Sequence, residues 1–124
     1  MGSVILLSAF RTSEHDKMLH NIAAPFFDLA ERLEDARENA PDAETWQAML
    51  ETNSFIWRAT ADFLPRNFDD EVSEETTEIL KNVADFMPRA SRAIMNEPES
   101  DVCAQMVALN RNMYNQLLTM RAGA

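Results

Sequence analysis

The sequence predicts an all-α fold, an up-down bundle of about four helices, in one domain that spans residues 1–124. Apolar residues recur at spacings of three and four in four successive segments, which is typical of helices with one buried face. Proline and capping residues separate these segments. Both glycines lie near the ends, at Gly2 and Gly123, so the chain between them lacks the residue that supplies positive φ in hairpins and phosphate loops. A hairpin-rich β fold, a P-loop and a Rossmann site are therefore not expected.

The composition indicates a small acidic protein without disulfides. The chain has 21 acidic and 11 basic side chains and a net charge of −10, which repels phosphate backbones. We therefore expect no direct DNA binding. Cys103 is the single cysteine, and Val4 to Leu7 is too short an apolar run, without a basic flank, for a secretory signal. No apolar run approaches the ~20 residues of a membrane span, so we expect a cytoplasmic protein that does not enter the membrane.

The first helical segment runs from about Ser13 to Asn39. Pro25 lies inside it, and an interior proline removes one backbone hydrogen bond and crowds the preceding turn. The pattern therefore predicts a first helix that is kinked near Ile22 or split into two. Residues 1–10 are open to three readings: a strand-like arm, a short helix or a tail.

The second segment opens at Pro41 and Asp42, and we expect Asp42 to be its N-cap. The segment should end at Leu64-Pro65, because a residue before proline avoids the α region. Residues 65–72 then form a linker. One side of this helix collects the apolar residues and two polar ones: Trp46, Met49, Leu50, Asn53, Ile56, Trp57, Thr60, Phe63 and Leu64.

The third segment begins after Ser73, the expected N-cap, and Pro88 should lie on its solvent face. The expected buried stripe is Ile79, Leu80, Val83, Phe86, Met87, Ala90 and Ile94. The fourth begins at Ser100 and Asp101 and carries apolar residues over about half its circumference: Val102, Cys103, Met106, Val107, Leu109, Met113, Tyr114, Leu117, Leu118 and Met120. Short connections favour antiparallel neighbours, which gives the up-down bundle.

Three residues break the apolar and polar pattern. Asn53 and Asn110 each lie within an apolar stripe, where an amide without partners costs roughly 1 to 3 kcal/mol. Either the amides bond to each other, or to Trp57 or Tyr114, and set the helix register, or they line a groove that accepts a partner's backbone. Phe55 points away from the stripe, among Ala48 and Ala59, and is either an isolated exposed ring or a docking point for a helix.

The sequence gives little support for catalysis, a metal or a cofactor. His15 and His20 are five residues apart and point in different directions on a helix, and one cysteine makes no usual zinc set. Neither histidine follows a glutamate at the spacing of a di-iron bundle, and no nucleophile elbow occurs. We therefore expect a protein that is not an enzyme and that binds neither metal nor cofactor.

The chain resembles the flagellar biosynthesis regulator FlaF family. The residues that carry the resemblance are AMLETNSFIW at 48–57, Leu64-Pro65, ILKNVADF at 79–86 and MVALNRNMYNQLL at 106–118. Asn53 with Trp57, and Asn110 with Met113, fall on the family's A-L-x-x-N-x-x-L-W and I-N-x-x-I-like elements. The chain departs from the family pattern at Val72–Glu75, before the third helix, and at Gln116-Leu117, near the C-terminus.

Membership would imply a cytoplasmic protein that acts on flagellin production, either as a flagellin-binding chaperone or together with the regulator FlbT. We accordingly expect a regulator that works by protein–protein interaction, with flagellin or FlbT as its partner. An unrelated helical adaptor, or a bundle that binds a small apolar ligand, is the alternative. The candidate partner contacts are Asn53, Phe55, Trp57, Met95, Asn110 and Met120.

Overall fold

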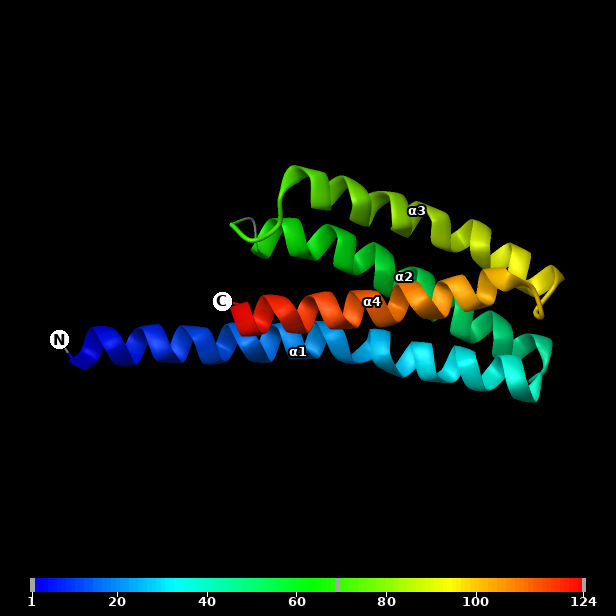
Figure 1. Ribbon diagram of the computed structural model, residues 1–124, viewed down its shortest axis with the longest axis horizontal. Coiled ribbons are helices and arrows are strands. Elements are labelled where there is room, and N and C mark those ends of the chain that lie inside the picture. Colours follow the sequence, from blue (N-terminus) through cyan, green and yellow to red (C-terminus); the bar gives the residue numbers. More distant parts are fainter. Residues whose placement is uncertain (1, 69, 124) are drawn as a thin grey trace.

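A computed structural model describes the backbone of residues 2–68 and 70–123, and the side chains of residues 14, 16–68 and 70–120. It contains helices α1 (Gly2–Asn39), α2 (Ala43–Asn67), α3 (Glu74–Asn96) and α4 (Asp101–Gly123). Successive helices run in opposite directions (Figure 1). Helix α1 packs most extensively along α4, and α2 along α3, while α1–α2 and α3–α4 contacts close the ring. The expected all-α up-down bundle is confirmed.

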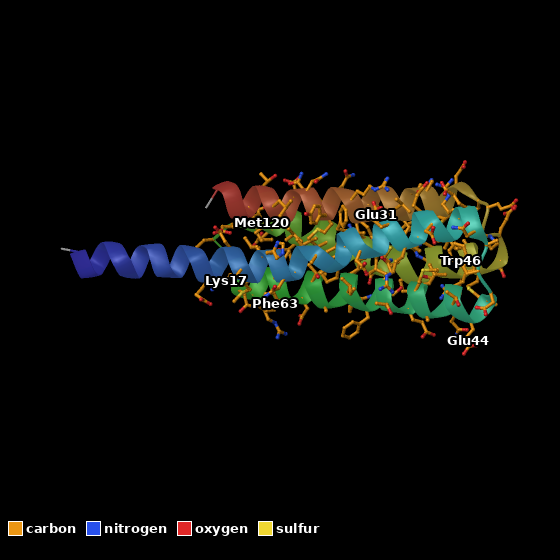
Figure 2. The ribbon with its side chains drawn as sticks, turned by 90° about the horizontal axis from the view of Figure 1, so that it is seen from below. Lys17, Glu31, Glu44, Trp46, Phe63 and Met120 are labelled. Carbon is orange, nitrogen blue, oxygen red and sulfur yellow. The ribbon has the colours of Figure 1, made fainter. Side chains whose placement is uncertain are left out.

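Helix α1 continues through Pro25 without a break. Figure 2 shows the helix bending between its blue and cyan parts, so the proline changes its direction but does not split it. Proline 25 frees the carbonyl of Asn21, and Asn21 is exposed, so water can satisfy that carbonyl. The backbone of residues 2–10 is helical and belongs to α1, which runs past the end of the bundle in Figure 1.

Both predicted N-caps are confirmed. The Asp42 carboxylate accepts a hydrogen bond from the Thr45 backbone N–H at 2.8 Å, and the Ser73 hydroxyl accepts one from Thr76 N–H at 3.1 Å. The hydrogen bonds from Thr45 hold the pKa of Asp42 below its ordinary value. Each cap satisfies a backbone donor that the first helical turn leaves free.

The predicted end of α2 at Leu64-Pro65 is wrong, because the helix runs on to Asn67. The Phe68 N–H donates to the Leu64 carbonyl at 2.8 Å and closes a further turn around the proline. Phe68 is buried and its ring lies 6.3 Å from that of Phe63, so packing holds this turn in place. Tertiary contact therefore outweighs the local preference of a residue before proline.

The core lies along the axis between the four helices and contains most of the expected apolar residues. Helix α3 is rotated from its predicted phase: Ala84 is buried, Val83 and Phe86 are half-buried, and Ile79 is 54% exposed. Pro88 is half-buried and does not lie on the open solvent face. The buried apolar side chains are Leu19, Ala23, Phe26, Leu29, Ala30, Leu33, Ala36, Trp46, Leu50, Trp57, Ala61, Leu64, Phe68, Val72, Leu80, Ala84, Met87, Ala90, Ile94, Cys103, Met106, Val107, Met113 and Leu117.

Candidate functional site

A hydrogen-bonded polar layer crosses the centre of the bundle. The Trp57 indole N–H donates to Asn110 Oδ1 at 2.7 Å, and Asn110 Nδ2 donates to Asn53 Oδ1 at 2.6 Å. Asn53 Nδ2 donates to the Met87 sulfur at 3.3 Å, and the Phe26 ring packs edge-on against Trp57 at a centroid distance of 5.1 Å. These five side chains come from all four helices, so they fix the helices at one level of the bundle.

The polar layer joins helices whose backbones do not touch. Helices α2 and α4 lie diagonally across the bundle, and the bonds from Asn110 to Trp57 and Asn53 bridge them. Both asparagines are fully buried and accept and donate hydrogen bonds in the core. The interpretation in which the amides bond to each other and set the register therefore fits the structure.

This geometry corrects part of the predicted partner surface. Asn53, Trp57 and Asn110 were candidate contacts, but all three are buried, and a partner cannot reach them in this conformation. Of the other candidates, Phe55 is 72% exposed, Met95 is 36% exposed and Met120 is half-buried. These three lie on three different helices, α2, α3 and α4.

An apolar groove runs between α1 and α2. We call it the α1–α2 groove and define it by Ile22, Pro25 and Leu29 of α1 and by Met49, Ile56 and Phe63 of α2. It consists of two adjoining hollows of about 650 Å³ and 430 Å³ that share Pro25 and Ile56. Phe55 lines the rim of the smaller one. In Figure 2, Glu44 and Phe63 mark the two ends of α2 along which the groove lies.

The local sequence of α2 explains why side chains do not fill the α1–α2 groove. Small side chains, Ala48 and Ala59, line the α2 wall, and they leave space that larger residues would fill. Two ion pairs flank the groove: Arg32 to Asp28 at 3.0 Å, and Arg66 to Asp62 at 3.3 Å. Both pairs are well exposed and therefore add little to stability. The groove thus offers an apolar floor between rims that carry the two ion pairs and the Glu44 carboxylate.

Sequence reasoning found Phe55 but missed the α1 wall of the groove. The role of Pro25 as a groove residue depends on where α2 lies, which the periodicity of the first helix does not show. Only the juxtaposition of Ala48 and Ala59 with Phe55 signalled this face in the sequence.

The histidines and the cysteine do not form a reactive or metal-binding cluster among the described side chains. His20 is exposed, and the side chain of His15 lies outside the described residues. No three histidine, cysteine, aspartate or glutamate side chains group at metal-binding distance within the described part of the chain. Cys103 is buried, and this desolvation raises the pKa of its thiol. No helix among the described residues combines the length and the apolar character that crossing a bilayer requires.

Comparison with known proteins adds no relative. No protein-family model, curated protein or solved structure matches this chain.

Proposed function

We propose that this chain is a cytoplasmic regulator of flagellin production of the FlaF type, which acts by binding a helical segment of flagellin in the α1–α2 groove. The proposal rests on the residues that resemble the FlaF family and on one structural observation. That observation is an apolar groove with a phenylalanine, Phe55, that is 72% exposed on its rim. A regulator that works by contact needs such a surface and no reaction centre.

The dimensions of the groove suit a helix. Its α2 wall runs from Glu44 to Asn67, about 35 Å at ~1.5 Å per residue, which matches a partner helix of about 23 residues. An amphipathic helix would lay its apolar face against Ile22, Ile56 and Phe63. Its polar face would remain in water beside the flanking ion pairs.

Phe55 provides the most direct test. Burying an exposed phenylalanine contributes about 2 kcal/mol, which corresponds to roughly 30-fold in affinity. Phe55→Ser should therefore weaken flagellin binding by that order and leave the bundle folded. Ile79→Ser is the matched control, because Ile79 is also a large exposed apolar residue but lies on α3, outside the groove.

The experiment mixes folded protein with monomeric flagellin and follows the complex by size-exclusion chromatography and titration. We expect co-elution of the wild type and of Ile79→Ser, and loss of the complex for Phe55→Ser. Absence of co-elution at tens of micromolar would reject direct flagellin binding. A parallel mixture with FlbT then tests whether that regulator is the partner in place of flagellin.

A further inference from the structure

Helices α3 and α4 share an outer face that is built from uncharged side chains. We call it the α3–α4 face and define it by Ile79, Asn82 and Phe86 of α3 and by Gln105, Leu109 and Gln116 of α4. At about 100° per residue, the three α3 positions fall within about 60° of each other and the three α4 positions within about 40°. None of the six side chains is charged, in a chain whose net charge is −10.

Contacts on the opposite edges of the two helices show that these positions meet at one seam. Lys81 lines a hollow together with residues of α2, so it marks the α2 side of α3. Arg111 pairs with Glu31, and the Tyr114 ring lies 5.2 Å from that of Phe27, which marks the α1 side of α4. The α3–α4 face takes the other edge of each helix, across the bundle from the α1–α2 groove.

Charged side chains border the α3–α4 face but do not interrupt it. The nearest ones on its two helices are Glu75, Glu78, Arg89, Asp101 and Arg111. Glu75 and Asp101 lie at opposite ends of the face, and the other three lie along its outer edges. The hollows between α1 and α2 and between α2 and α3, by comparison, are lined by carboxylates and bases. Like-charge repulsion is therefore weakest at the α3–α4 face.

The face combines apolar surface with unbonded amides. Ile79 is 54% exposed, and Phe86 and Leu109 are half-buried where they pack against the core. The three amide side chains of the face are exposed and form no hydrogen bond with another described residue. Gln47, an exposed amide on α2, does donate one to Glu51 at 3.0 Å. A partner at the α3–α4 face would bury apolar surface and bond to the amides at once.

We propose that the α3–α4 face is a two-fold interface with a second copy of this chain. Near a two-fold axis each residue meets its own copy, so a charged side chain meets a like charge there. An amide carries both a donor and an acceptor, so it can bond to the same amide of the second copy. Two copies of this acidic chain therefore approach with the least repulsion at this face. The face shares no residue with the α1–α2 groove, so the inference goes beyond the flagellin site.

The size of the face predicts a weak dimer. From Val102 to Met120, α4 is about 27 Å long at ~1.5 Å per residue, and two adjoining helices are about 20 Å wide at ~10 Å each. Each copy thus offers about 500 Å², or about 1,000 Å² over both copies, which is the lower limit for a specific interface. Repulsion between two chains of net charge −10 weakens the dimer further, and salt screens that repulsion. We therefore expect salt to strengthen the dimer.

Sedimentation velocity of the full-length protein tests the inference, from micromolar to submillimolar concentration at about 0.01 M and about 0.5 M salt. We expect a monomer–dimer equilibrium that shifts toward the dimer at high salt. Asn82→Glu with Gln105→Glu places carboxylates in the face and should weaken the dimer at least tenfold. The matched control is Asn21→Glu with Gln47→Glu, which adds the same two charges on α1 and α2 and should keep the dimer at high salt.

Two single variants separate this interface from the flagellin site. Ile79→Ser should weaken the dimer at least tenfold, because a two-fold interface contains Ile79 twice. It should leave flagellin binding unchanged. Phe55→Ser should do the reverse, since Phe55 lies on the rim of the α1–α2 groove. Circular dichroism checks that all the variants remain helical.

Several results would overturn the inference. One is a protein that sediments as a monomer at every concentration and at both salt levels. Another is an equal loss in the two double variants, which would reflect net charge and not the α3–α4 face. A dimer that persists in Ile79→Ser but is lost in Phe55→Ser would place self-association in the α1–α2 groove. Growth beyond the dimer would show an open-ended contact in place of a two-fold one.

Discussion

Asn110 is the residue on which the polar layer depends most, and replacing it with leucine tests the layer directly. Asn110→Leu removes the acceptor of the Trp57 indole N–H and the donor to Asn53 Oδ1. Both partner atoms would remain buried without hydrogen bonds, at a cost of about 1 to 3 kcal/mol each. The added apolar side chain offsets part of this cost, because a leucine is favoured in a core.

The net loss in the free energy of unfolding should therefore be about 2 to 4 kcal/mol, a large share of the ~5 to 15 kcal/mol of a typical domain. For a chain of this size the melting temperature should fall by about 10 °C. Urea unfolding followed by tryptophan fluorescence measures the change, since Trp57 is part of the layer. Asn112→Leu is the control, because Asn112 is exposed on the same helix.

The reasoning fails if Asn110→Leu is as stable as the wild type, or more stable. That result would mean that the buried amides contribute no net stability, as happens when a well-packed apolar residue replaces a buried polar group. Equal losses for Asn110→Leu and Asn112→Leu would show that leucine disturbs α4 in general and that the hydrogen bonds are not the cause.

Three further predictions concern particular side chains. In urea titrations, Leu80→Ala should lower the free energy of unfolding by about 2 to 4 kcal/mol, because Leu80 is buried. Ile79→Ala should lower it by less than about 0.5 kcal/mol, because Ile79 is exposed. The reverse order would show that the phase of α3 is wrong. Asp42 has a lowered pKa when folded, so the stability that it adds over Asp42→Ala should be present at neutral pH and vanish as pH falls below that pKa; a difference that persists in acid would contradict a charged cap. Cys103 is buried with a raised thiol pKa, so a thiol reagent at pH 8 should label it only when urea unfolds the chain, and rapid labelling of the native protein would contradict its burial.

The elements that could be predicted are those that depend on neighbours in the chain. Asp42 and Ser73 begin helices because each side chain reaches a backbone N–H three residues ahead. The exposure of Phe55 follows from its angular distance from the Trp57 stripe on the same helix. The sequence also predicted that Asn53 and Asn110 need hydrogen-bond partners, since each amide lies within an apolar stripe.

Packing between distant segments decided the end of α2, the phase of α3 and the partners of the buried amides. The α2 helix extends past Pro65 because Phe68 is buried, and Ile79 is exposed because α3 turns Ala84 toward the core. The diagonal approach of α2 and α4 decides which amide accepts the hydrogen bond of Trp57. It also decides that Asn53 and Asn110 face each other and not a groove. The sequence by itself determined the number and order of the helices and most of their apolar faces, because capping and periodicity act over a few residues. Only the tertiary structure decided which faces close and which stay open, because that depends on how side chains from four separate helices fill a shared space.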